Sequence, residues 1–231
     1  MPLIFSISLT AQEASQIDQL RIQVWADLDP FPGSFDSPSS VGQSESFQPQ
    51  ADDKLAIFEY AINRTKEITP FLMSGMLNGW MFEYTPFDKT RRVEEYWSFE
   101  EILPFNPSIN HITYHAPKAM DDRLVCWAYC NKTPMQKQEY EHWSSIVHPH
   151  IKGIGKGPVE AGFEGIKEAC SQAAKNAVRE YWRTKIKNKP KEIDGKLLLI
   201  RNPRIYIKDG NYVVDLDFFL ETDKIIEYTL Y

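Results

Sequence analysis

Cysteine is scarce in this sequence, which has three cysteines among 231 residues. That count is too small for the disulfide framework that supports many small secreted folds. Cys126 and Cys130 fall on one face of an alternating apolar run, where a strand would hold them about 13 Å apart, beyond the reach of a disulfide. Cys170 lies on the apolar side of a helical pattern and is expected to pack as a small hydrophobic group.

Two further absences limit the partners of the protein. The sequence has no run of about 18 apolar residues, so we expect no membrane-spanning helix. Its 26 Lys and Arg residues are outnumbered by 32 Asp and Glu residues, which gives a net charge of -6. A chain without an excess of positive charge neutralises few phosphates, so we expect no nucleic-acid partner. The lysines in residues 185–196 are explained by a solvated helix end and loop.

Motifs for nucleophilic catalysis and phosphate binding are also missing. The sequence has no Gly-x-Ser-x-Gly elbow, and none of its cysteines has the sequence context of a nucleophile. The run GIGKGP at 153–158 departs from a Walker loop, because Pro158 follows Gly157 and removes an amide that a phosphate would use. We interpret residues 148–162 as a turn-rich hinge into a helix, and we expect no cofactor.

A metal-dependent hydrolase is the alternative to a protein without enzymatic activity. Its zinc ligands would come from a set of cysteines and histidines, namely Cys126, Cys130, His142, His148 and His150. Zinc requires such sulfur and nitrogen ligands around one tetrahedral position. Two cysteines separated by three residues in a strand fit that geometry poorly, so we predict no metal site and no enzymatic activity.

The N-terminal residues allow two interpretations. The run from Leu3 to Leu9 resembles the end of the hydrophobic region of a secretory signal, although no basic segment precedes it. Residues 1–11 are then either a clipped signal, or a first strand or tail. The first interpretation, which we favour, makes the protein periplasmic or secreted. The second makes it cytoplasmic.

What the sequence does contain is a regular succession of helices and strands. Apolar residues at steps of three and four predict helices over 54–68, 69–78, 133–147 and 160–186. The second of these is separated from the first because threonine and proline at 69 and 70 are typical of a helix start. Alternation predicts strands over 18–26, 80–87, 110–116, 123–131, 196–202, 204–207 and 212–220, with a tight hairpin at 208–211.

The order of these elements predicts an α+β fold with helices packed on antiparallel sheets, because consecutive strands are not separated by helices. Residues 1–51 contain a strand and an irregular arm rich in Pro, Ser, Gly and Gln. Residues 52–150 form a first helix-plus-sheet unit, and 151–231 form a second unit with a long helix and a meander. The repeated order suggests a duplication, but the two halves share too few identities to establish one.

The last third of the chain resembles a known family. The run GIGKGP is followed by a helix rich in alanine, then by Gly195, a strand, a hairpin and Tyr212; the helix carries Ala169, Ala173, Ala174 and Ala177. In this pattern, residues 153–230 are similar to a domain of small bacterial envelope lipoproteins, in which one alanine-rich helix packs on a β-meander. The chain departs from that family because it lacks a lipid-attachment cysteine. The resemblance implies a non-enzymatic protein of the bacterial envelope.

Aromatic residues beside arginines form the predicted binding surface, because both residue types are enriched where proteins contact ligands and partners. The predicted contact residues are Arg91, Arg92, Tyr96, Trp97 and Trp127. We predict a binding or scaffolding module whose partner is another envelope protein or a small ligand.

Overall fold

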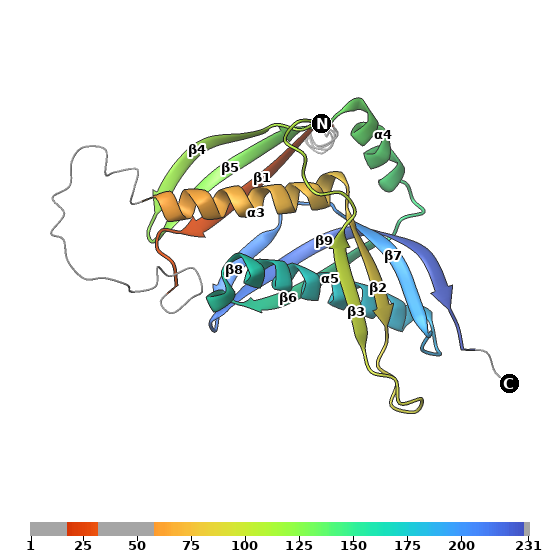
Figure 1. Cartoon of the computed structure of the whole chain (residues 1–231). Helices are drawn as coiled ribbons and strands as arrows, with labels where there is room; N and C mark the ends of the chain where they lie inside the picture. Colours follow the sequence, from red (N-terminus) through yellow and green to blue (C-terminus); the bar gives the residue numbers. More distant parts are fainter. Residues whose placement is uncertain (1–17, 32–57, 229–231) are drawn as a thin grey trace, which may run out of the picture.

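The computed structural model describes residues 18–31 and 58–228, which form two antiparallel sheets with helices packed on them (Figure 1). The smaller sheet has the strand order β1-β5-β4, and the larger has the order β3-β2-β7-β9-β6, with β8 paired to β9. This arrangement confirms the predicted α+β class. The apolar N-terminal run, residues 32–51 of the irregular arm and the start of the helix predicted from residue 54 lie outside the described residues.

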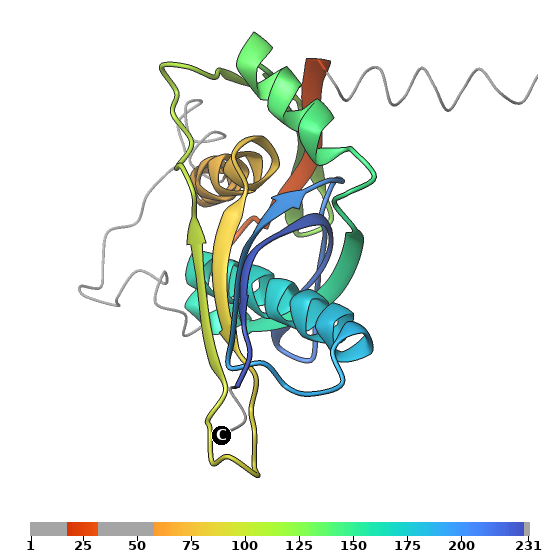
Figure 2. The same ribbon diagram turned by 90° about the vertical axis from the view of Figure 1, so that its right-hand side faces the viewer.

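The smaller sheet consists of β1 (Gln19–Asp27), β5 (Arg123–Asn131) and β4 (Ile112–Met120). The central strand is β5, as its two apolar faces predict, and it pairs with β1 along its whole length. Helix α3 (Glu59–Leu77) packs against β1 and β5 on one side and reaches β7 and α5 of the larger layer on the other (Figures 1 and 2). The core therefore continues from one sheet to the other through α3.

The continuity of α3 corrects one prediction. The helix passes through Thr69 and Pro70 without a new start, so these residues are neither an N-cap nor a first helical position. The hydroxyl of Thr69 donates instead to the carbonyl of Thr65 at 2.7 Å. Thr69, Leu72 and the turn around them are buried between the two layers, and this packing stabilises a proline that a solvated helix would not tolerate.

The larger sheet joins strands from both halves of the chain. Its members are β2 (Trp80–Thr85), β3 (Tyr96–Glu101), β6 (His150–Pro158), β7 (Glu192–Leu199), β8 (Arg204–Lys208) and β9 (Asn211–Ile226). Strand β2 pairs with β3 on one side and with β7 on the other, so one sheet spans both predicted units. The predicted tight hairpin connects β8 to β9, and its two central residues, Asp209 and Gly210, both have positive φ.

Helix α5 (Phe163–Lys185), which confirms the predicted long helix, packs directly on β6. The predicted hinge at 148–162 is wrong, because most of it is strand β6, followed by the short 3-10 helix η1 (Val159–Ala161). Three alternating glycines face the helix, and a Cβ at Gly155 would lie 2.0 Å from the carbonyl oxygen of Ala169. Only glycine permits that approach, so GIGKGP provides a surface for the backbone of α5.

The remaining helix, α4 (Pro134–Trp143), begins at a capping box in which Thr133 and Gln136 satisfy each other's backbone amides. Trp143 is buried in a small cluster with Leu198, Ile200 and Phe219 on the larger sheet. Within the described ranges, none of the helices combines the length and the hydropathy that crossing a bilayer requires.

Candidate functional site

The hairpin formed by β2 and β3 lies along α5, and we call the contact between β3 and α5 the seam. Two polar contacts join its middle. The indole N–H of Trp97 donates to the Ser171 hydroxyl at 2.9 Å. The ammonium of Lys175 lies 3.2 Å from the Glu95 carboxylate, and both side chains are partly exposed. The seam is therefore fixed at its centre and leaves a concave region toward each end of α5.

Aromatic stacking places Trp97 in the seam. Its ring stacks on Phe82 and Phe99, with ring centroids 5.5 and 6.0 Å apart. Alternation along β3 puts Trp97 and Phe99 on the face that looks toward α5, and Tyr96 on the opposite face. Trp97 and Phe99 of β3 therefore belong to the interior, and Tyr96 does not.

Toward the C-terminal end of α5 lies a cavity of about 380 Å³, here called the basic groove. Its walls are largely apolar and its margin is cationic; the lining residues are Tyr84, Pro86, Phe87, Glu95, Arg179, Trp182, Arg183, Ile186, Lys187, Lys189, Pro190 and Ile193. The lysines that we attributed to a solvated loop contribute two of the four cations. A concave apolar site with a few charged groups is typical of small-molecule sites of this volume.

Within the described part of the chain, only some of the cations that line the basic groove have a carboxylate or carbonyl partner. Arg179 and Lys187 have no carboxylate partner among the described residues, whereas Arg183 pairs with Glu180 and Lys189 donates to the carbonyl of Phe87. The carboxylate that lines the groove, Glu95, is already paired with Lys175. The groove therefore carries an excess of positive charge that a bound anion would complete.

Two polar groups of the groove are buried. The phenol of Tyr84 donates to the Glu95 carboxylate at 3.1 Å, and burial, together with the charge of Glu95, raises the pKa of Tyr84 above its ordinary value. The phenol is therefore a neutral donor at physiological pH. The indole Nε1 of Trp182 is buried and has no hydrogen-bond partner among the described residues. An unsatisfied buried donor is costly, and an oxygen of a ligand would relieve it.

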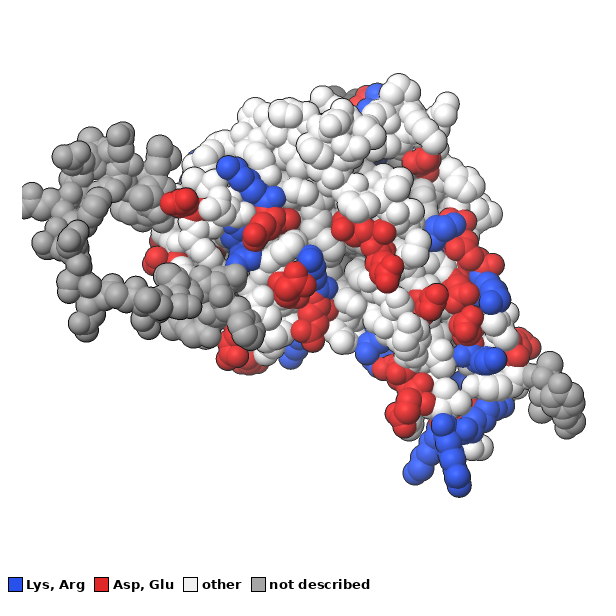
Figure 3. Space-filling model, viewed as in Figure 1, with Lys and Arg blue, Asp and Glu red and all other residues white. Residues whose placement is uncertain are grey.

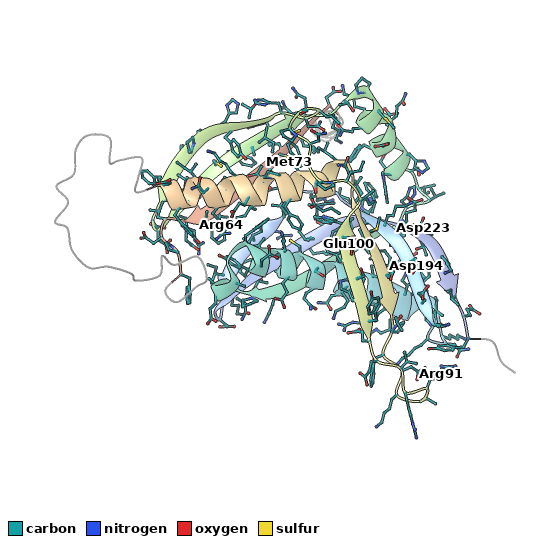
Figure 4. The ribbon with its side chains drawn as sticks, in the orientation of Figure 1. Arg64, Met73, Arg91, Glu100, Asp194 and Asp223 are labelled. Atoms are coloured by element: carbon teal, nitrogen blue, oxygen red, sulfur yellow. The ribbon has the colours of Figure 1, made fainter. Side chains whose placement is uncertain are left out.

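Toward the N-terminal end of α5 lies a second cavity of about 490 Å³, here called the aromatic cavity. It is lined by Phe71, Trp80, Phe99, Glu100, Glu101, Glu164, Lys167, Glu168 and Ser171, which come from α3, β2, β3 and α5. Acidic side chains gather on this face over β3 and α5, whereas basic side chains gather at the tip of the β2–β3 hairpin (Figure 3). Glu100 extends from β3 in the labelled view (Figure 4).

The structure distributes the five predicted contact residues over several places. Arg91 and Arg92 lie at the tip of the β2–β3 hairpin, where Arg91 pairs with Asp88 at 2.6 Å (Figure 4). Trp97 lies in the seam, and Tyr96 is exposed on the opposite face. Trp127 belongs to β5 of the smaller sheet, where the Arg21 guanidinium lies 3.8 Å from its ring. Four of the five thus belong to one hairpin, and Trp127 belongs to a different surface.

The cysteines and histidines that a metal-dependent hydrolase would use as ligands do not lie together. Cys126 and Cys130 are buried in the smaller sheet, and burial raises the pKa of each thiol to about 11. Of the histidines, His142 lies in the last turn of α4, His148 follows that helix and His150 begins β6. The rings of His142 and His148 are 4.9 Å apart. Among the residues that the structure describes, no three His, Cys, Asp or Glu side chains come close enough to hold a metal ion.

A profile of a protein family whose members are uncharacterised matches residues 8–228. The chain belongs to this family. It is also 26% identical over 212 residues to an uncharacterised protein of Treponema pallidum (strain Nichols), an alignment that covers 92% of this chain and 83% of that protein. No solved structure matches the chain. These comparisons assign no activity, so the resemblance to envelope lipoproteins stays a prediction.

Sequence reasoning missed the residues that line the two cavities, although a signal was present. The residues of α5 and its C-cap that face the seam recur at steps of three and four; they are Glu164, Glu168, Ser171, Lys175, Arg179, Trp182 and the C-cap Ile186. This polar stripe lies beside the apolar stripe that packs on β6. The charged residues of this stripe are acidic near the start of the helix and basic near its end. A search for apolar periodicity does not detect this change.

Proposed function

We propose that the protein is a non-enzymatic binding module whose basic groove takes a small anion with a hydrophobic portion, such as an aryl or acyl carboxylate. The observation that carries this proposal is the combination of apolar walls with cations that lack carboxylate partners, Arg179 and Lys187. A carboxylate satisfies such cations through charge-assisted hydrogen bonds, and an apolar body fills the volume behind them.

The geometry of the groove supports a bound molecule rather than a purely structural ion pair. Phe87 is half exposed at the margin, and Trp182 and Ile186 contribute apolar surface behind the cations. The Trp182 indole offers a donor in the same cavity. Basic side chains also gather at the tip of the same hairpin (Figure 3), and this positive region would favour the approach of an anion.

The fluorescent anion 8-anilinonaphthalene-1-sulfonate tests the proposal. We expect it to bind the folded full chain and to be displaced by octanoate but not by octylammonium, which has the same chain and the opposite charge. Replacing Arg179→Gln together with Lys187→Gln should weaken binding at least about tenfold, because two charge-assisted contacts are lost. A control variant with the same loss of charge elsewhere, Lys156→Gln with Lys208→Gln, should bind as the wild type does.

Several outcomes would contradict the proposal. Equal displacement by octanoate and octylammonium would show that the groove does not select charge. An unchanged affinity in the Arg179→Gln/Lys187→Gln variant would place the probe elsewhere. The variant Trp182→Phe keeps an aromatic ring and removes the indole donor, so we expect a smaller loss of affinity, about threefold to tenfold.

We also propose that the protein acts in the bacterial envelope, in the periplasm or outside the cell. This proposal is supported by the apolar run from Leu3 to Leu9 and by the lipoprotein-like pattern of the last third. Fractionation of the bacterial cells in which the gene occurs naturally, with detection by an antibody raised against the full chain, provides the test. Release of the protein with the periplasmic fraction is expected, and retention with the cytoplasmic fraction would contradict the proposal.

A further inference from the structure

From the aromatic cavity we propose a second binding site, which takes a small organic cation, specifically an ammonium group with an oxygen atom a few bonds away. This site lies at the other end of the seam from the basic groove and does not depend on the function proposed for that groove. Its evidence is a floor of aromatic rings, an excess of carboxylates around them, and a fully buried donor without a partner.

Three rings from three different elements line the cavity. Trp80 on β2 lies between Phe71 of α3 and Phe99 of β3, with ring centroids 5.3 and 5.1 Å away. The two phenylalanines are partly exposed, whereas Trp80 is completely buried beneath them. Faces of aromatic rings attract cations within about 6 Å, and groups of such rings recognise quaternary ammonium compounds. The partly exposed rings of Phe71 and Phe99 are therefore the ones that an ammonium group in the cavity can contact.

The charged residues of the cavity also favour a cationic ligand. Four carboxylates line it, from Glu100, Glu101, Glu164 and Glu168, against one ammonium from Lys167. Lys167 is paired with Glu164 at 2.8 Å, and Glu101 accepts a hydrogen bond from the Ser74 hydroxyl. Glu100 and Glu168 have no cationic partner among the described residues, so the cavity keeps an excess of negative charge.

The indole of Trp80 provides the independent indication of a ligand. Trp80 is fully buried, it lines the cavity, and its Nε1 has no hydrogen-bond partner among the described residues. Its ring is held tightly, since a Cβ at Gly75 would lie 2.3 Å from it. A cation cannot accept a hydrogen bond from an N–H, so a ligand that also satisfies this buried donor must carry an acceptor oxygen that reaches beneath the two phenylalanines. An amino alcohol or an ester of one has both groups.

Choline is a suitable probe, and 3,3-dimethyl-1-butanol is its neutral counterpart of nearly the same shape. Calorimetric titration of the full chain should show choline binding, with the neutral compound at least about tenfold weaker because the cation–π and carboxylate contacts need the charge. The variant Glu164→Gln/Glu168→Gln should lose affinity for choline about tenfold. Glu139→Gln, an exposed carboxylate on α4, serves as the control and should bind as the wild type does.

The rings have a separate test. Phe99→Leu keeps the apolar volume and removes one aromatic face, so it should weaken choline binding by about threefold to tenfold. Far-ultraviolet circular dichroism and the midpoint of urea denaturation establish that each variant is folded. Absence of choline binding at millimolar concentrations, equal binding of the neutral compound, or full affinity in the Glu164→Gln/Glu168→Gln variant would each overturn the proposal. None of these results would bear on the anion site.

Discussion

The two ends of the seam share one helix and one hairpin, yet they offer opposite charges. At the aromatic cavity, α5 contributes Glu164 and Glu168 beside rings from α3, β2 and β3. At the basic groove, the same helix contributes Arg179 and Arg183 beside apolar groups of the hairpin and of the α5–β7 connection. The acidic and basic residues are separated by on the order of 20 Å along the helix axis, more than the screening length of physiological salt.

This comparison shows how one scaffold supports two different sites. The side of α5 that packs on the glycines of β6 consists of alanines and Gly165 and fixes the helix position. Because that side fixes the helix, the residues on the side that faces the seam can carry different charges at its two ends. Acidic residues at the start of a helix and basic residues at its end also complement the helix dipole, so this arrangement stabilises α5 as well as defining two sites.

The largest expected effect comes from removing the surface on which α5 rests. Gly155→Val would place side-chain atoms against the backbone of Ala169, where even a Cβ would lie 2.0 Å from the carbonyl oxygen. We expect the free energy of unfolding to fall by at least about 3 kcal/mol, and both probes to lose affinity together. Urea denaturation measures this change. Lys156→Val, at the neighbouring exposed position, should have little effect, and equal stability of the two variants would contradict the role of GIGKGP.

The next largest effect tests whether the seam is one structural unit. Ser171→Ala removes the hydroxyl that accepts from the Trp97 indole and leaves that donor unsatisfied. The expected loss of stability is about 1 kcal/mol. Affinities for choline and for 8-anilinonaphthalene-1-sulfonate should both decrease slightly, because Ser171 lines the aromatic cavity and its contact with Trp97 holds β3 against α5. An unchanged affinity for the anionic probe would show that the basic groove is held independently of this contact.

A smaller effect should separate the two ends. Glu95→Gln removes a carboxylate from the basic groove and frees Lys175, while the aromatic cavity loses none of its lining residues. We expect affinity for the anionic probe to rise about threefold, since partly exposed ion pairs contribute up to about 1 kcal/mol. Choline affinity should stay the same. Weaker anion binding in this variant would indicate that Glu95 positions the groove rather than limiting its charge.

The smallest effect concerns pH and the phenol at the basic groove. Burial raises the pKa of Tyr84, so the folded protein holds a neutral phenol at a pH where the unfolded chain, with a tyrosine pKa of about 10, begins to ionise. The stability that this phenol contributes is therefore complete below pH about 10 and decreases above it. The difference in free energy of unfolding between the wild type and Tyr84→Phe should be constant from pH 7 to about 9 and smaller at pH about 10.5.

Much of the fold was predictable because it depends on local periodicity. Alternation identified β5 as a central strand, and steps of three and four residues identified α5. Two features were not predictable in this way. GIGKGP reads as a flexible segment until α5 is placed against it, and Thr69-Pro70 reads as a helix start until the burial of α3 is known. In both cases a contact between distant residues overrides the local preference.

The candidate site was predictable only in part, for a related reason. The sequence directed attention to the hairpin that carries Arg91 and Trp97, but alternation alone could not show that Trp97 faces α5. Trp127 has the same residue type and a similar setting in the sequence, yet it lies in the other sheet. The cavities combine residues from up to four elements, and only the packing of α5 and α3 on the sheet brings them together.

The central claim is that the two ends of the seam select ligands of opposite charge, and the indole N–H resonances of the protein test it most directly. Each cavity is lined by one tryptophan whose buried indole N–H has no partner among the described residues, Trp182 in the basic groove and Trp80 in the aromatic cavity. In nitrogen–proton correlation spectra, with assignments from Trp182→Phe and Trp80→Phe, octanoate should shift the Trp182 resonance and leave Trp80 unchanged. Choline should shift Trp80 and leave Trp182 unchanged. The claim would be contradicted if both compounds moved the same indole resonance, or if neither compound moved either one.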